Sequence, residues 1–229
     1  MKKLLKGFTL AEALITLAII GVTASLAMPT LQTNSQRAQV APALLKAINN
    51  IESANRLALQ QNNVRTLDNL PVPGFNNVFV NSGIAYVNTV LLPLLGLTRI
   101  DNDENIQYRN NNQNYPHRFI FSSKDGIYYV VANNDLNMVN RQNSPVEYGG
   151  RQFSLHIDVN GPKGPNIMGR DLYRVAIDTK GEVLPIGSRV FARYSNMPLT
   201  WEQNCNSERI NNVEFCAGSV VDNGRVIHF

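Results

Sequence analysis

An apolar run near the start of the chain predicts a long helix. Residues 8–28 are about 21 residues with one charged side chain, Glu12, and a helix of that length spans roughly 30 Å, the thickness of the hydrocarbon core of a bilayer. Three lysines precede the run, at Lys2, Lys3 and Lys6. Because basic residues stay on the cytoplasmic side of a membrane, we expect a single membrane span with everything after Met28 outside the inner membrane.

The helix is expected to continue beyond this run as an amphipathic helix. Between residues 35 and 60, apolar side chains recur every three or four positions, at Ala41, Leu44, Ile48, Ile51, Ala54 and Ala58. This spacing indicates one helix face that packs on a globular domain. Pro29 and Pro42 should bend the helix, or they divide it into two or three short helices.

The second half of the chain has the pattern of β-strands. Alternating apolar residues at 153–159 predict a strand with one buried face, and hairpins are predicted at 119–131, 175–184 and 220–227. Short connections indicate antiparallel pairing, so we expect an α+β fold in which a long N-terminal helix packs on an antiparallel sheet. Between 62 and 116 the pattern predicts only a turn at 70–74, a short helix at 87–97 broken at Pro93, and an Asn-rich loop at 101–114.

The residues around the start of the apolar run allow three interpretations. A basic start, an apolar core and small residues at 25–27 are typical of a secretory signal, and a plain membrane anchor also accounts for the run. The third interpretation rests on Lys6-Gly7 before Phe8-Thr9-Leu10-Ala11-Glu12, followed by a long apolar helix with Pro29 at its end. This pattern resembles the leader of the type IV pilin and type II secretion pseudopilin family. The resemblance implies cleavage between Gly7 and Phe8 by a prepilin peptidase, and N-methylation of Phe8.

Glu12 helps to separate these interpretations. A carboxylate inside an apolar segment costs a few kcal/mol, so it usually has a partner and a function, and neither a secretory signal nor a passive anchor needs one there. If the chain starts at Phe8, the new amine lies one helical turn from Glu12. The two groups could meet within one subunit or, as the family resemblance implies, Glu12 could neutralise the amine of a neighbour in a filament.

The resemblance implies a pilin-like organisation in four parts: a leader at 1–7, a transmembrane and filament-core helix at 8–28, its amphipathic continuation at 29–60, and a head domain at 61–229. It also implies several partners, namely the prepilin peptidase, other pilin or pseudopilin subunits, and an inner-membrane assembly platform with its ATPase. The protein would then lie in the bacterial inner membrane with a cytoplasmic N-terminus, and later in a filament in the periplasm or at the cell surface. A secretion pseudopilus, a surface pilus and a DNA-uptake pilus all remain open. So does a membrane-anchored binding module that does not polymerise.

The net charge and the residue types of the chain limit which kinds of function the sequence supports. The formal net charge is +4, and removing the three leader lysines leaves +1, so the charge does not argue for a nucleic-acid partner. The three histidines, His117, His156 and His228, are scattered, and the segment Gly161-Pro162-Lys163-Gly164 lacks the phosphate-binding pattern. We therefore expect neither catalysis nor an organic cofactor.

Cys205 and Cys216 are the two cysteines of the chain. In an exported protein an even count at short spacing predicts a disulfide, and a disulfide-bounded C-terminal loop also resembles many type IV pilins. The alternative is a zinc site, but zinc needs three or four protein ligands and His228 is the only candidate nearby.

A loop between residues 158 and 171 is the remaining candidate site. Asp158 and Asn160 lie two residues apart on one strand face, glycines and prolines make the following loop compact, and Asp171 could return toward them. Oxygen ligands on a rigid loop suit calcium, although the spacing is not that of an EF-hand. The alternative is a turn whose Asp and Asn side chains bond to their own backbone.

Overall fold

The computed structural model describes residues 9–71, 84–100, 106–110, 113–115, 117–132, 152–195, 200–205 and 213–223. Of residues 26–37 it describes the helical backbone only. The chain forms two compact units that divide between Gln39 and Val40. Helix α1, Leu10–Gln61, begins in the first unit and ends in the second.

The predicted N-terminal helix is one continuous element. Pro29 and Pro42 both lie within α1, so the interpretation as two or three short helices is wrong. A proline inside a helix removes one backbone hydrogen bond and crowds the carbonyl four residues earlier. This loss is local, and the other turns of the 52-residue helix keep their own hydrogen bonds.

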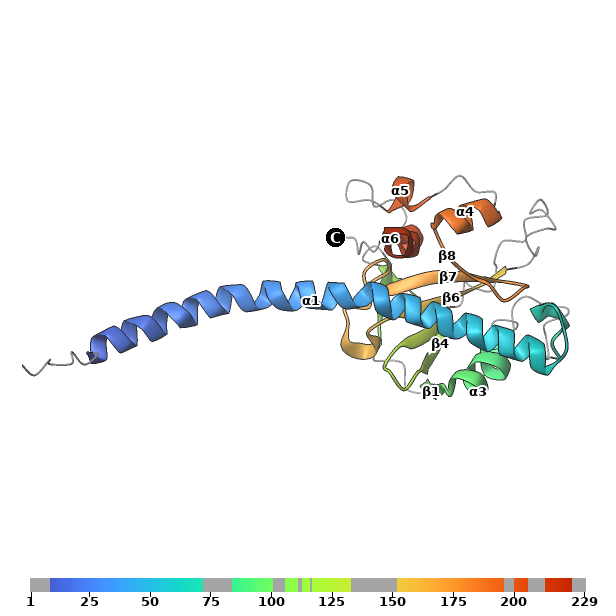
Figure 1. Cartoon of the computed structure of the whole chain (residues 1–229), viewed down its shortest axis with the longest axis horizontal. Helices are drawn as coiled ribbons and strands as arrows, with labels where there is room; N and C mark the ends of the chain where they lie inside the picture. Colours follow the sequence, from blue (N-terminus) through green and yellow to red (C-terminus); the bar gives the residue numbers. More distant parts are fainter. Residues whose placement is uncertain are drawn as a thin grey trace, which may run out of the picture. The chain divides into compact units, whose positions relative to one another are not determined.

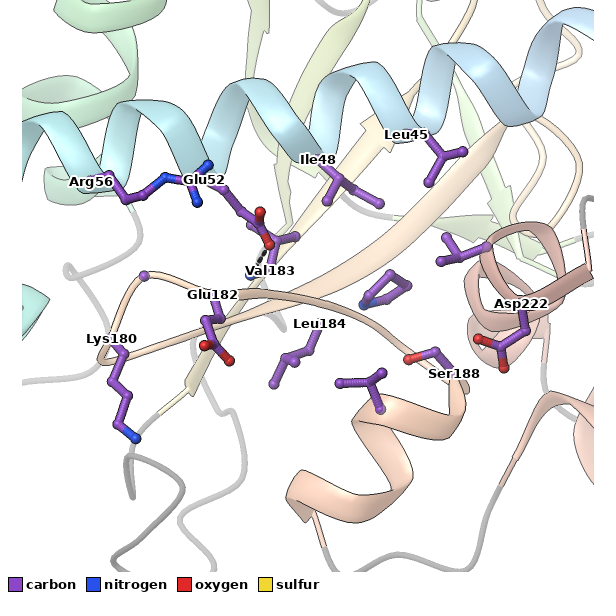
Figure 2. Close-up of a pocket in the computed structure, with 14 residues that line it drawn as sticks. Leu45, Ile48, Glu52, Arg56, Lys180, Glu182, Val183, Leu184, Ser188 and Asp222 are labelled. Atoms are coloured by element: carbon purple, nitrogen blue, oxygen red, sulfur yellow. Dashed lines mark hydrogen bonds between the residues drawn. The ribbon is translucent and has the colours of Figure 1, made fainter.

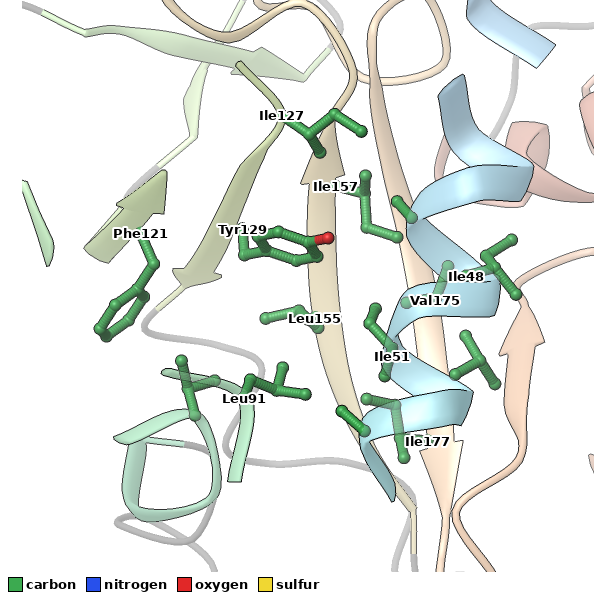
Figure 3. Packing of buried hydrophobic residues seen from close by; sticks show 14 of the residues in the cluster. Ile48, Ile51, Leu91, Phe121, Ile127, Tyr129, Leu155, Ile157, Val175 and Ile177 are labelled. Carbon is green, nitrogen blue, oxygen red and sulfur yellow. The ribbon is translucent and has the colours of Figure 1, made fainter. Parts of the chain in front are cut away.

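The second half of α1 buries the apolar stripe that its sequence predicted. Leu44, Ile48, Ile51, Ala54 and Ala58 are buried in one cluster with the inner residues of the sheet, and Ala41 is partly buried against it. Figure 3 shows Ile48 and Ile51 of α1 beside Leu155, Ile157, Val175 and Ile177 of the sheet. The amphipathic interpretation is therefore confirmed.

Six strands form the main sheet within the described part of the chain, in the order β1-β4-β5-β6-β7-β8. Their bounds are Thr98–Ile100 for β1, His117–Ser122 for β4, Tyr128–Ala132 for β5, Gln152–Asp158 for β6, Leu172–Asp178 for β7 and Val183–Pro185 for β8. All neighbours are antiparallel. The strands from β4 to β8 follow one another in the chain and in the sheet, so the predicted meander and the hairpins at 119–131 and 175–184 are confirmed.

Both faces of β6 are buried, which corrects the prediction of one buried face. Leu155 and Ile157 face α1, yet Ser154, His156 and Asp158 on the opposite face are also buried. Cover on that side comes from the segment after β8 (Figure 1), in a second cluster that includes Ile120, Val130, Ala176, Leu184, Phe191, Trp201 and Phe215. The polar side chains of β6 alternate with apolar ones as predicted, but they face protein instead of water.

The segment after β8 is mostly helical. It contains α4 (Arg189–Ser195), α5 (Trp201–Asn204), the 3-10 turn η6 (Val213–Phe215) and α6 (Cys216–Asn223). The predicted hairpin at 220–227 is wrong where the structure describes it, because Val220 and Val221 lie in α6; its second strand lies outside the described residues. A close backbone contact holds α6 in place: Gly218 donates its N–H to the Ile186 carbonyl at 3.0 Å. A Cβ at position 218 would lie 2.2 Å from the Gly187 carbonyl carbon, so this contact requires glycine.

The region between α1 and β4 is more ordered than its sequence suggested. The short helix expected at 87–97 is present as a π-helical turn η2 (Val87–Leu91) followed by α3 (Leu92–Leu95). Pro93 does not break it, because it lies in the first turn of α3, where a missing N–H is tolerated. Gly96 ends α3 with a φ of 60°.

Two other expectations for this region have mixed outcomes. The Asn-rich segment 101–114 contains strand β2 (Tyr108–Asn110) and the beginning of β3 (Gln113–Tyr115), which pair as a small antiparallel sheet, so its assignment as a loop is wrong there. Of the turn expected at 70–74, the structure describes residues 70 and 71 only: Leu70 follows the 3-10 turn η1 (Leu67–Asn69) with extended backbone angles, and 72–74 lie outside the described residues.

Asp178 closes the β7–β8 turn with a buried carboxylate. Its side chain is 1% exposed and accepts the Glu182 N–H at 2.7 Å. Burial, and then the charge of Glu182, raise the pKa of Asp178 from its ordinary value of 3.8 to about 6. The folded chain therefore binds the proton of Asp178 more tightly than the unfolded chain does. The stability that the protonated Asp178 contributes to the folded chain is fully present below pH 3.8 and is lost as pH rises through about 6.

Asp178→Asn should remove this pH dependence. Asparagine can still accept the Glu182 N–H, so relative to the wild type the variant should gain stability as pH rises from 4 to 7. The gain can reach about 3 kcal/mol, at 1.36 kcal/mol per pKa unit. Thermal unfolding over this pH range measures it. A difference that does not change with pH would contradict the assignment.

Asp125→Asn is the control of opposite sign. The Lys46 ammonium, 2.7 Å from the Asp125 carboxylate, and then the Ser123 hydroxyl lower the pKa of Asp125. That carboxylate stabilises the folded chain above its unfolded pKa, and the stabilisation is lost as pH falls. Asp125→Asn should therefore be most destabilising near pH 7 and approach the wild type in acid.

Candidate functional site

Thr9 and Glu12 cap the start of α1 together. The Thr9 N–H donates to Glu12 Oε2 at 2.9 Å, the Thr9 hydroxyl donates to the same oxygen at 2.7 Å, and the Glu12 N–H donates to Thr9 Oγ1 at 3.3 Å. These reciprocal bonds form a capping box, in which each side chain satisfies a backbone N–H that the first helical turn leaves free. Glu12 thus has a partner within its own chain.

The first turns of α1 carry apolar side chains without cover. From residue 10 to 25, the large apolar side chains are between 58% and 81% exposed, at Leu10, Leu14, Ile15, Leu17, Ile19, Ile20 and Val22. The hydroxyls of Thr16, Thr23 and Ser25 donate to carbonyls of preceding turns, so they need no water in apolar surroundings. A contiguous exposed apolar surface marks a contact with lipid or with another chain.

Two sequence predictions for this segment are not confirmed. Gly7 and Phe8, the predicted cleavage and methylation residues, lie outside the described residues. The search for membrane spans covered the described residues, and no helix there is long and apolar enough to cross a bilayer. The span at 8–28 and the pairing of Glu12 with an N-terminal amine therefore stay predictions.

The loop from β6 to β7 brings together the three residues singled out in the sequence. Asp158, at the end of β6, accepts the N–H groups of Asn160 at 3.2 Å and Gly161 at 3.0 Å, and the Tyr108 hydroxyl at 3.1 Å. A 3-10 turn, η5 (Gly161–Lys163), follows. These bonds show Asp158 organising the turn of its own backbone.

Asp171 closes the same loop from its other end. Its carboxylate accepts the N–H groups of Ile167 at 2.7 Å and Asn166 at 2.8 Å, and the Asn160 amide donates to it at 3.2 Å. Four backbone N–H groups therefore point at two carboxylates. These hydrogen bonds are the ones expected if the loop is a turn whose Asp and Asn side chains bond to their own backbone.

Burial dominates the electrostatics of the loop. Burial, and then the charge of Asp171, raise the pKa of Asp158 to about 7, against the effect of its backbone hydrogen bonds. Burial also raises the pKa of Asp171. Burial and the charge of Asp158 raise the pKa of Tyr108, so its hydroxyl remains a proton donor to that carboxylate.

The loop also holds two acceptors that lack donors. Asn160 Oδ1 and Asn166 Oδ1 are buried, and no hydrogen-bond donor reaches them among the described residues. A buried acceptor without a donor costs about 1–3 kcal/mol, so such oxygens usually contact a water or an ion. In the described part of the chain, no three His, Cys, Asp or Glu side chains group as metal ligands. Any cation here would therefore use amide oxygens with two carboxylates.

The two cysteines are bonded to each other, as predicted. Cys205 and Cys216 form a disulfide with their Cα atoms 5.2 Å apart, and both are buried in the cluster on the second face of the sheet. A zinc site at these cysteines is therefore ruled out, because disulfide sulfurs are not thiolate ligands.

Sequence reasoning missed three contributors to these sites. Thr9 could have been found, because Thr-x-x-Glu before an apolar run is the capping-box pattern. Asn166 lies inside the loop between residues 158 and 171, but its role depends on the geometry of the turn. Tyr108 has no local signal: β2 reaches the loop through Arg109, whose N–H donates to the Asn166 carbonyl at 2.9 Å and whose carbonyl accepts the Met168 N–H at 2.9 Å.

The structure thus defines an α+β protein with a capped, apolar N-terminal helix. Residues 3–28 match the family described as the prokaryotic N-terminal methylation motif. The chain is similar to the type IV major pilin protein PilE1 of Neisseria gonorrhoeae, with 49% identity over 47 residues, 20% of this chain and 28% of that protein. It is equally similar to a fimbrial protein of Neisseria meningitidis serogroup B, with 49% identity over 47 residues and the same coverage of both chains.

The N-terminal segment is similar to that of type IV pilins. The match spans less than a third of the length of these relatives. No solved structure matches the chain.

Proposed function

We propose that this protein is a structural subunit of a type IV filament, assembled through its N-terminal helix. The observation that carries the proposal is the N-terminal methylation motif at residues 3–28, which coincides with a helix whose apolar side chains are uncovered. In the membrane, lipid covers these side chains; in the filament, the helices of neighbouring subunits do. The subunit does mechanical work and has no catalytic role.

The remaining parts of the proposal follow from the family. A prepilin peptidase cleaves between Gly7 and Phe8 and methylates Phe8, and an inner-membrane platform and its ATPase drive assembly. The head lies outside the inner membrane, where oxidising conditions suit the Cys205–Cys216 disulfide. The names of the relatives, a major pilin and a fimbrial protein, favour a type IV pilus over a type II secretion pseudopilus. A membrane-anchored binding module is the alternative, and it would stay in the membrane fraction when filaments are sheared from cells.

Processing is the first test. Mass spectrometry of the N-terminal peptide should find methylated Phe8 as the first residue. Gly7→Val should leave the precursor intact, because the peptidase requires a small residue before the cut. Gly21→Val is the matched control: a side chain there meets no atom within 4 Å, so processing should be unchanged. A mature chain that begins at Met28 would establish a secretory signal, and an intact Met1 a plain anchor.

The role of Glu12 is the second test. If its charge neutralises the amine of a neighbour, Glu12→Val and Glu12→Gln should be cleaved yet be absent from sheared filaments. Thr9→Val should still assemble, because it keeps the charge and removes only the cap, a loss of about 1 kcal/mol. Failure of Thr9→Val with normal assembly of Glu12→Gln would show that the cap matters and the charge does not.

A second proposal concerns the β6–β7 loop, which we propose binds calcium. Asp158 and Asp171 would supply carboxylate oxygens, and Asn160 and Asn166 the two buried amide oxygens that lack donors. Calcium takes six to eight oxygen ligands in flexible geometry, so backbone carbonyls and water would complete the shell. The ion would neutralise two buried carboxylates and satisfy both amide oxygens at once.

Melting curves of the full chain in detergent, with calcium or with chelator, test this site. At calcium about 100-fold above Kd, binding should stabilise the folded chain by about 2.7 kcal/mol, which corresponds to roughly 5–10 °C in Tm. Asp158→Ala should abolish the increment, and Asp178→Asn, another buried carboxylate, should retain it. Identical curves in calcium and chelator would mean that the loop is only a turn.

A further inference from the structure

The hairpin of β2 and β3 is held on the head by the β6–β7 loop and not by the main sheet. Its two three-residue strands form a small sheet of their own, and a two-stranded hairpin is at best marginally stable by itself in water. Among the described residues, each backbone hydrogen bond from this hairpin to another element goes to residues 166–168. The order of the hairpin therefore depends on the loop.

The contacts between hairpin and loop involve both the main chain and a side chain. Arg109 donates its N–H to the Asn166 carbonyl at 2.9 Å, and its own carbonyl accepts the Met168 N–H at 2.9 Å. Tyr108, the preceding residue of β2, is 1% exposed and lies in the same buried cluster as Met168. Its hydroxyl donates to Asp158 Oδ2 at 3.1 Å. The hairpin thus contacts the loop near its beginning and near its end.

Two of the residues that hold the hairpin also belong to the proposed calcium site. Asn166 has a φ of 56°, a left-handed conformation that asparagine tolerates. Its N–H donates to Asp171 at 2.8 Å and its carbonyl accepts the Arg109 N–H, while its buried Oδ1 has no donor among the described residues. Asp158 likewise is a proposed ion ligand and accepts the Tyr108 hydroxyl.

The orientation of Asn160 is consistent with this ion site. Its amide nitrogen donates to the Gly164 carbonyl at 3.0 Å and to Asp171 at 3.2 Å, so the oxygen is the atom of the amide that is left without a donor. An ion that binds this oxygen, Asp158 and Asn166 fixes the two acceptors on which β2 depends. By linkage, ion binding and hairpin docking then favour each other by the same factor.

We propose that calcium bound at the β6–β7 loop holds the β2–β3 hairpin against the head, and that Tyr108 in turn positions the ion ligand Asp158. This inference rests on the calcium site proposed above and adds a consequence of its occupancy. Arg109 is exposed, so the ion controls the order of a surface element. Tyr108 is a positioning residue, because it acts on the ion through Asp158.

Hydrogen exchange of the full chain in detergent, with calcium or with chelator, tests the effect on the hairpin. Calcium should slow exchange of the Arg109 and Met168 amides by about 5- to 150-fold, the usual range of coupling between two sites. The Val183 amide is the reference, because Glu52 of α1 accepts its N–H at 3.3 Å (the dashed line in Figure 2). It opens locally, so calcium should leave its exchange unchanged.

Calorimetry on the same samples separates the two proposals. If calcium binds and the Arg109 and Met168 amides exchange as fast as in chelator, the coupling is overturned and the calcium site stands. If no heat of binding is found, both are overturned. Asn166→Gly keeps the left-handed backbone accessible and removes the amide oxygen, so calcium should protect the Arg109 amide less in this variant than in the wild type.

Tyr108→Phe tests the positioning of Asp158. The variant keeps the buried ring and removes the hydroxyl, so the calcium Kd should rise by about 10- to 100-fold, the range for residues that orient metal ligands. Tyr86→Phe is the matched control, because Tyr86 is also fully buried but donates its hydroxyl to Asn55 in the cluster under α1. Its Kd should equal that of the wild type. Equal Kd values for Tyr108→Phe and the wild type would overturn the positioning role, whatever the loss in Tm.

Discussion

The packing of the α1 stripe on the sheet is the interaction on which the head depends. Ile48 and Ile51 contact the strands through residues such as Ile157 and Val175, and burial of each side chain of this size contributes about 1.5–3 kcal/mol. The same helix turns also hold polar neighbours. Asn55 is fully buried, donates to the Gly181 carbonyl at 2.8 Å and accepts the Tyr86 hydroxyl. One helix therefore orders the sheet, the β7–β8 turn and the segment that contains η2.

The second face of the sheet is built by different means. Arg174 contacts both Ser154 and Glu214, at 3.2 and 2.5 Å, so a polar pair fixes η6 over the strands. The disulfide and the close contact between Gly218 and Gly187 then hold α6. These contacts keep buried polar groups satisfied where apolar side chains alone would leave them without partners. The C-terminal segment can therefore cover the sheet with only short helices.

The two parts of α1 differ in how their apolar side chains are covered. The part of α1 before residue 26 carries apolar surface that its own chain does not cover, whereas the stripe from Leu44 to Ala58 is committed to the head. One helix thus has an uncovered apolar part and a second part that belongs to the core of a folded domain. The β6–β7 loop is ordered by its own hydrogen bonds.

Local patterns in the sequence determined the helix, the meander and the disulfide. Apolar periodicity in α1, alternation in β6 and the hairpin pattern at 119–131 depend on neighbours a few positions away, and the structure has all three elements there. Cys205 and Cys216 paired as their spacing predicted. The prepilin motif also depends on adjacent residues alone, so it could be recognised without a structure.

Tertiary contacts decided what local patterns could not. Val220 and Val221 have the composition of a strand, but they lie in a helix because α6 packs at Gly187. Ser154, His156 and Asp158 have the spacing of a solvent face, but they are buried because a segment more than 30 residues later covers them. Tyr108 reaches Asp158 across 50 positions. In each case the partner is distant in the chain, and no pattern of neighbouring residues encodes which distant surface a segment will meet.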